Sequence, residues 1–134
     1  MTESEWVEFA YKGFPHVASV GRLDAALCAE LSASTNLVRI RHDYVCKLMH
    51  KHKWEPHRLA MMEICMAFGR VIRDRPWHLT FFHFDEIVYG GWHHLTIKSA
   101  DHGHELWVAT FHPQSPSEVK RLTARGTLIR SETA

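Results

Sequence analysis

The sequence has no apolar run near the roughly 18 residues that a membrane-spanning helix needs. Its N-terminus, MTESEWVEF, is acidic where a signal peptide carries a basic and then an apolar segment. Cysteine is scarce: Cys28, Cys46 and Cys65 are odd in number and form no CxxC spacing, which is typical of reduced, mostly buried thiols. We therefore expect a cytoplasmic protein without a disulfide framework and without a membrane partner.

Neither sign of charge is in excess, because 16 Lys and Arg face 15 Asp and Glu, for a formal net charge of +1. Bulk charge therefore predicts neither a nucleic-acid nor a membrane partner, and any electrostatic site must be local. The 134 residues are 46% hydrophobic and 23% charged. These values match one folded domain and exclude disorder, collagen-like sequence and coiled coil.

Histidine is the one residue type in clear excess, with twelve in the chain. Histidine is a common metal ligand and the side chain best suited to proton transfer near neutral pH. The local clusters, at positions 50/52, 93/94 and 102/104, match neither HExxH nor a Cys/His finger spacing. We predict no metal site and no cofactor. A zinc site assembled from distant histidines, as in a zinc hydrolase, remains the alternative.

Residues 1–36 are interpreted as an N-terminal extension with one short helix. Leu23, Leu27 and Leu31 recur at every fourth position and so share one helix face. Residues 1–20 have aromatic side chains without periodicity and stay unassigned, as an arm, a hairpin or a docking segment.

Two helices are predicted after the short β-prone segment 37–40. The first runs from His42 to about His52, which places His42 at a helix start. The second follows Pro56 and ends at Gly69. Its methionine-rich stripe is expected to lie in the core.

Aromatic and β-branched segments at 78–84, 93–99 and 105–112 predict three successive strands of an antiparallel meander. A helix over 116–125 follows, since Ser115 can cap it and Glu118 can complete a capping box. TLIR at 127–130 can supply a last strand. The expected fold is α+β: N-terminal helices packed on a small antiparallel sheet of about four strands, with a C-terminal helix, over residues 37–134.

The register of the last two meander strands follows from their alternating side chains. A three-residue loop, 102–104, would pair position 98 with 108, 96 with 110, and 94 with 112. It would turn Trp107 and the other apolar side chains toward the helices. The opposite face would then carry a polar strip, listed here: His94, Thr96, Lys98, Thr110 and His112. A two- or four-residue loop would instead place Lys98 beside Trp107.

The chain from 37 to 130 resembles the phage-associated branch of the barnase, EndoU, colicin and RelE-like (BECR) ribonuclease superfamily. The resemblance is carried by the order of LVRIRHDY, LTIKS, WVATFHP and SPSEVKRLTARGTLIR. That family has a histidine near the first helix, a lysine in a central strand and a threonine or serine in the following strand. These positions map onto His42, Lys98 and Thr110 of this sequence.

The resemblance implies metal-independent endoribonuclease activity, in which the ribose 2′-hydroxyl attacks phosphorus and leaves a 2′,3′-cyclic phosphate. Such chemistry needs a base, an acid and a group that stabilises the phosphoryl charge. The expected catalytic residues are His42, Lys98, Thr110 and His112. The expected substrate-binding residues are His94, Thr96, Arg121 and Arg125, the two arginines holding flanking phosphates.

The expected partners are RNA and a cognate inhibitor protein that restrains a toxin-like nuclease. The balanced charge implies selection by shape or by an unpaired site rather than tight nonspecific binding. A non-catalytic binding protein, such as a phage-encoded inhibitor or adaptor on the same fold, is the alternative. Convergence of His42, Lys98, Thr110 and His112 on one phosphate-sized position would favour the enzyme. A His42 side chain elsewhere would favour the binding protein.

Overall fold

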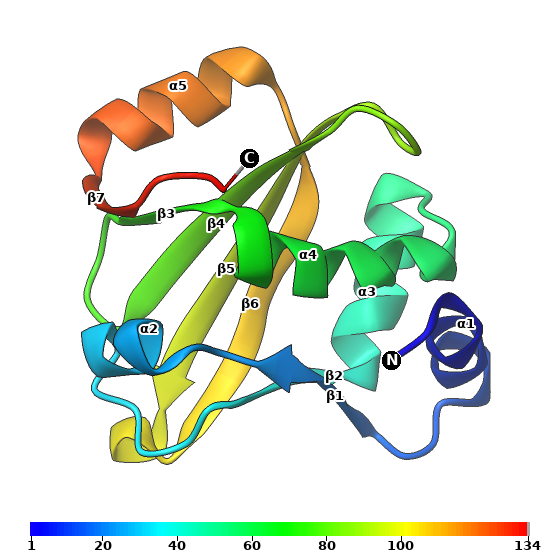
Figure 1. Ribbon diagram of the computed structural model, residues 1–134. Coiled ribbons are helices and arrows are strands. Elements are labelled where there is room, and N and C mark those ends of the chain that lie inside the picture. Colours follow the sequence, from blue (N-terminus) through cyan, green and yellow to red (C-terminus); the bar gives the residue numbers. More distant parts are fainter. Residues whose placement is uncertain (134) are drawn as a thin grey trace.

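The computed structural model describes residues 1–133, and over these residues the chain forms the predicted α+β fold (Figure 1). The α-helices are α1 (Glu3–Lys12), α2 (Ala25–Glu30), α3 (His42–His52), α4 (Met61–Phe68) and α5 (Pro116–Arg125). Two short 3₁₀ helices, η1 (Pro56–Ala60) and η2 (Asp101–Gly103), accompany them. The strands are β1 (Val17–Arg22), β2 (Leu37–Arg41), β3 (Arg70–Arg73), β4 (His78–Asp85), β5 (Gly91–Ala100), β6 (Glu105–Gln114) and β7 (Thr127–Arg130).

All seven strands of the described chain join one sheet in the order β1-β2-β6-β5-β4-β3-β7. The sheet therefore has more strands than the four or so predicted, and one of its six strand pairings is parallel instead of antiparallel. The meander β4-β5-β6 lies at the centre as predicted, but β2 adds to β6 in parallel, and β3 and β7 extend the other side. The sheet is mixed because β2 reaches β6 through a long-range pairing that local periodicity does not reveal.

Residues 1–36 contribute to the same sheet rather than standing apart from it. The short helix expected there is α2, and α1 and β1 precede it. The α1 helix begins with a capping box between Thr2 and Glu5 and ends at Gly13 in the left-handed region. The β1 strand pairs antiparallel with β2. Trp6 of α1 is fully buried, so this stretch completes the main core.

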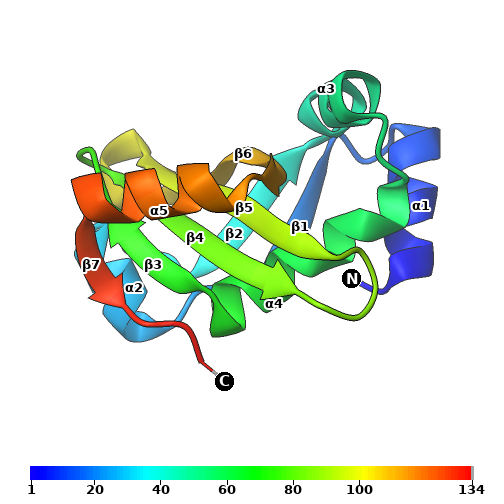
Figure 2. The same ribbon diagram turned by 90° about the horizontal axis from the view of Figure 1, so that it is seen from above.

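Helix α5 packs on the face of the sheet opposite to α4, and this surface is called the α5 face below (Figure 2). Val119 and Leu122 of α5 contact Ile72 and Phe82 from the sheet. The Ser115 side chain caps the helix by accepting a hydrogen bond from the Glu118 amide. The Glu118 carboxylate does not complete the predicted capping box. It pairs with Arg121 instead.

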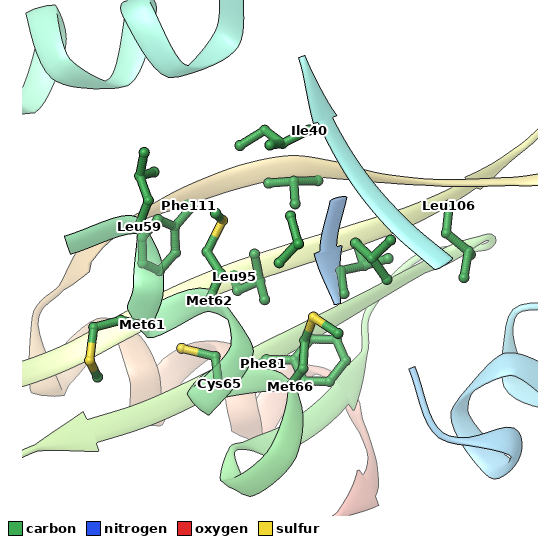
Figure 3. Packing of buried hydrophobic residues seen from close by; sticks show 14 of the residues in the cluster. Ile40, Leu59, Met61, Met62, Cys65, Met66, Phe81, Leu95, Leu106 and Phe111 are labelled. Atoms are coloured by element: carbon green, nitrogen blue, oxygen red, sulfur yellow. The ribbon is translucent and has the colours of Figure 1, made fainter. Parts of the chain in front are cut away.

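The main core lies on the other face of the sheet, where the predicted methionine stripe packs as expected (Figure 3). Met62 and Met66 of α4 are buried against Phe81 of β4 and Leu95 of β5. The three cysteines are free thiols and two of them are buried, which agrees with the expectation of mostly buried thiols. Cys28 and Cys65 are buried, and Cys46 of α3 is exposed.

Gly103, in the turn between β5 and β6, closely approaches the backbone of the loop after α2. Its φ is +88°, and a Cβ atom there would lie 2.2 Å from the Ser32 carbonyl oxygen. We expect Gly103→Ala to lower the free energy of unfolding by about 2–5 kcal/mol, because left-handed strain of about 1–2 kcal/mol adds to a steric penalty of about 1–3 kcal/mol. Urea denaturation measures this loss.

Gly90→Ala is the matched control, since Gly90 has φ +64° and open space around the position of a Cβ atom. An alanine at position 90 has the left-handed strain but no steric clash, so this variant is expected to lose only about 1–2 kcal/mol of unfolding free energy. Equal losses in the two variants would contradict the packing role of Gly103.

Candidate functional site

The polar side chains predicted from the strand register do share the α5 face. His94 pairs with His112, and Thr96 pairs with Thr110, as expected. Beyond them the register shifts, because the loop has four residues, 101–104, and a bulge in β6 absorbs the extra one. Lys98 is therefore opposite Trp107 and not position 108.

The four-residue loop places Trp107 on the α5 face, so the prediction that its ring faces the main core is wrong. The ring lies beneath two guanidinium groups, with the Arg39 and Arg41 Cζ atoms 4.5 Å and 4.0 Å from its centroid. Arg39 also pairs with Glu105 at 3.1 Å. Cations held over an aromatic face in this way keep a fixed position while their remaining N–H groups stay free to bind.

The strand pairings extend this cationic region into a row that crosses four strands. The row, called the cation row below, contains His78 of β4, Lys98 of β5, Trp107 of β6 and Arg39 of β2. Lys98 is exposed and lies at the centre of the row. Side chains of this kind match the backbone of a polyanion.

Three imidazole rings form a second row at the other end of β6, called the histidine row below. The His94 and His112 ring centroids are 4.5 Å apart, and His52 of α3 stacks on His112 with a centroid distance of 5.7 Å. His94 comes from β5, so the row joins the sheet to α3. Lys98 is four residues further along β5 than His94, which separates the two rows by about 13 Å along the strand.

His94 is held in place by hydrogen bonds on both ring nitrogens. Its Nδ1 lies 3.0 Å from the Gln114 side-chain oxygen and its Nε2 lies 2.9 Å from the Thr96 hydroxyl. That hydroxyl contacts Thr80 at 3.0 Å, and both threonines are buried. Burial, with His112 next in effect, lowers the pKa of His94 to about 4. His94 is therefore neutral at pH 7, and Thr96 positions it from beneath the surface.

His112 and His52 are the members of the row that can exchange protons with a ligand. Both are half-buried. The His112 Nδ1 lies 2.8 Å from the Pro113 carbonyl oxygen. Because a carbonyl only accepts, Nδ1 carries the hydrogen and Nε2 is left for chemistry. Burial lowers the pKa of His52, and the neighbouring His112 and Lys51 lower it further.

Thr110 lies between the two rows, beside Tyr44 of α3. The Tyr44 hydroxyl accepts a hydrogen bond from the Phe111 amide at 3.0 Å, and burial raises its pKa. This bond fastens α3 alongside β6 and so fixes the position of His52 relative to His112.

His42 does not join these residues. Its Nε2 lies 2.9 Å from the Ala10 carbonyl oxygen, and its ring packs edge-on against Phe9 with a centroid distance of 5.4 Å. The side chain ties the start of α3 to α1. The expected convergence with Lys98, Thr110 and His112 is therefore not formed.

The two predicted phosphate-binding arginines lie on the exposed side of α5, each beside a carboxylate. Arg121 pairs with Glu118 at 2.8 Å and Arg125 with Asp74 at 3.3 Å. Neither belongs to the cation or histidine row. Arg125 lines a separate hollow near the turn before β4.

Sequence reasoning missed His52, Arg39 and Arg41 as site residues. His52 belonged to a noticed histidine pair at the end of a predicted helix, but its neighbour His112 is 60 positions away. The arginines alternate along β2, yet only the parallel pairing with β6 brings them over Trp107.

Among residues 1–133, no group of three or more His, Cys, Asp or Glu side chains is arranged to hold a metal ion. Within the same residues, no helix has the length and apolar character needed to cross a membrane. Comparison of the chain with family models, with curated proteins and with solved structures found no match in any of the three.

Proposed function

We propose that the protein is a metal-independent endoribonuclease that cleaves unpaired RNA laid along β6. The observation that carries this proposal is the stacked pair of imidazoles, His52 and His112, at one end of β6. Near the other end of β6, Lys98 of the neighbouring β5 and two arginines of the neighbouring β2 flank Trp107. Proton-exchanging groups and phosphate-binding cations are the two requirements of this reaction. The resemblance to BECR ribonucleases supports the same chemistry.

The proton transfers are assigned to the histidine pair. His52, whose pKa is lowered, is neutral at pH 7 and takes the proton from the ribose 2′-hydroxyl. The 2′-oxygen then bonds to phosphorus while the bond from phosphorus to the 5′-oxygen breaks. Protonated His112 gives its Nε2 proton to that leaving oxygen. The products are a 2′,3′-cyclic phosphate and a 5′-hydroxyl, and no metal or oxidant is needed for balance.

Substrate holding is assigned to the residues between and beyond the histidines. The Thr110 hydroxyl donates to a phosphoryl oxygen at the reacting phosphorus, where charge grows. Lys98, about 13 Å along the strand, is too far to share that phosphorus and instead binds a phosphate further along the chain. Arg39 and Arg41 act with it. An inhibitor protein that restrains the enzyme would present carboxylates to the same cations.

A binding protein without activity is the second candidate, because His42 contacts Ala10 and Phe9 of α1 and does not join the histidine row. If the site followed the pattern of the BECR family, the position of His42 would leave it without one catalytic group. The present proposal gives that role to His52, so the two candidates differ in whether His52 and His112 perform chemistry.

The deciding experiment incubates the purified protein with single-stranded RNA and with tRNA in excess EDTA. We expect cleavage that EDTA does not reduce, with cyclic phosphate at the new 3′ ends. A matched oligonucleotide with deoxyribose at every position is the control, since it lacks the attacking hydroxyl and should stay intact. RNA binding without any cleavage would contradict the nuclease and favour the binding protein.

A further inference from the structure

Trp77, in the turn before β4, combines an unfavourable backbone with an exposed ring. Its φ is +65°, and its side chain is 58% exposed. A bulky residue in the left-handed region is strained by about 1 kcal/mol or more, whereas glycine adopts it freely. The turn is held firmly, because the Ser99 amide donates to the Trp77 carbonyl oxygen at 2.9 Å. The turn itself has no need for the indole ring.

The ring borders a hollow of about 540 Å³ lined with arginines. Arg73 is fixed by Glu30 at 2.7 Å and Arg125 by Asp74 at 3.3 Å, while Arg75 is exposed. Three guanidinium groups face two carboxylates, so the lining keeps a positive excess. Each guanidinium has five N–H donors, and a pairing carboxylate leaves some of them free for an anion.

The turn that borders this hollow adjoins the end of the cation row. The residue after Trp77 is His78, which pairs with Lys98 in the cation row. The hollow has the two features by which proteins bind unpaired nucleotides: an aromatic ring on which the base stacks, and cations that contact the phosphate.

We propose that this hollow is a nucleotide subsite, in which an unpaired base stacks on Trp77 and its phosphate contacts Arg75 and Arg125. The inference rests on the proposed function for its ligand class, a single-stranded nucleic acid. Arg125, which was expected from the sequence to hold a phosphate, has that role in this hollow. Trp77 and Arg75 are additional binding residues.

The test measures binding, without cleavage, of a fluorescein-labelled single-stranded RNA with 2′-O-methyl groups throughout. Trp77→Gly removes the ring and also relieves the backbone strain, so this variant is expected to fold at least as well as the native chain. We expect its Kd to rise about 5- to 150-fold, the range seen when one stacking ring is lost. Trp77→Phe keeps a ring and should recover most of the affinity.

Tyr11→Ala is the matched control, because Tyr11 is also an exposed aromatic residue and lies on α1, outside the hollow. It should bind the oligonucleotide as the native protein does. A Trp77→Gly variant with native affinity, or an equal loss in Tyr11→Ala, would overturn the subsite. The proposed function fails separately: if unmodified RNA stays intact while binding still depends on Trp77, the subsite stands without the nuclease.

Discussion

Replacing His112 with alanine is expected to lower the rate of RNA cleavage by about 10²- to 10⁴-fold, the usual contribution of one positioned proton-transfer group. The effect is expected to be large because the His112 Nδ1 is tied to the Pro113 carbonyl oxygen, which leaves Nε2 oriented for the substrate. Multiple-turnover cleavage of a labelled single-stranded RNA in EDTA measures the effect. Circular dichroism and thermal unfolding establish that the variant is folded.

The same assay on His52→Ala should show a loss of similar size and a changed pH profile. The lowered pKa of His52 keeps it deprotonated below the usual range of histidine, so the acid limb of kcat/KM in the native protein is expected below pH 6.5. Removal of the base should remove that limb. A His52→Ala profile with an unchanged acid limb would assign the base to another group.

His42→Ala separates the site derived from the structure from the one implied by the family resemblance. Its imidazole contacts Ala10 and Phe9, so its removal is expected to reduce stability while the folded variant cleaves RNA at the native rate. His104→Ala is a second control, since His104 is exposed beside Asp101 in the turn after β5. Loss of activity in folded His42→Ala would restore the family assignment.

Local patterns were sufficient to predict most elements and one face of the site. The 3.6-residue periodicity of α3 and the alternation along β5 and β6 both correspond to the structure. The pairings of His94 with His112 and of Thr96 with Thr110 followed from patterning alone. These features depend on residues near one another in sequence, or joined by a short turn.

The remaining features depend on contacts that local patterns do not contain. The β3 strand has only four residues, directly after the α4 cap, and β1 lies in a stretch without clear alternation. The loop between β5 and β6 has four residues instead of the expected three, which places Trp107 opposite Lys98 on the α5 face. The bulge in β6 adds one residue and so restores the predicted pairings further along the strand. The helix-start position of His42 was correct, but its side-chain direction depends on α1, which was not predicted.

Stability is expected to fall as the pH drops from 7 to 5, because two adjacent histidines are held neutral in the folded protein. His93 is fully buried, and its Nε2 accepts a hydrogen bond from Arg58 at 3.0 Å. Burial first, and then Arg58, lower the pKa of His93 to about 4, and burial with His112 does the same for His94. The pKa of His93 is raised in part by Asp85 and lowered to a smaller extent by His83. The pKa of His94 is raised in part by the Gln114 hydrogen bond and by Asp74, and Arg75 lowers it slightly.

The direction of the effect follows from proton binding. In the unfolded chain both rings have a pKa near 6.5, so between pH 6.5 and 4 the unfolded state binds protons that the folded state does not. The stabilisation is complete above pH 6.5 and is lost as the pH falls toward 4. At pH 5 each histidine accounts for about 2 kcal/mol of lost unfolding free energy, or about 4 kcal/mol for both.

Urea denaturation of the native chain, His93→Gln and His94→Gln at pH 7 and pH 5 tests this expectation. Each glutamine variant should lose about half of the pH dependence, since glutamine cannot be protonated in this range, and an equal pH dependence in all three proteins would contradict it. The acid limb of cleavage from His52 falls in the same pH range. A native profile that is steep there combines protonation of the base with loss of folded protein, and His93→Gln, which leaves all three rings of the histidine row in place, reduces only the second contribution.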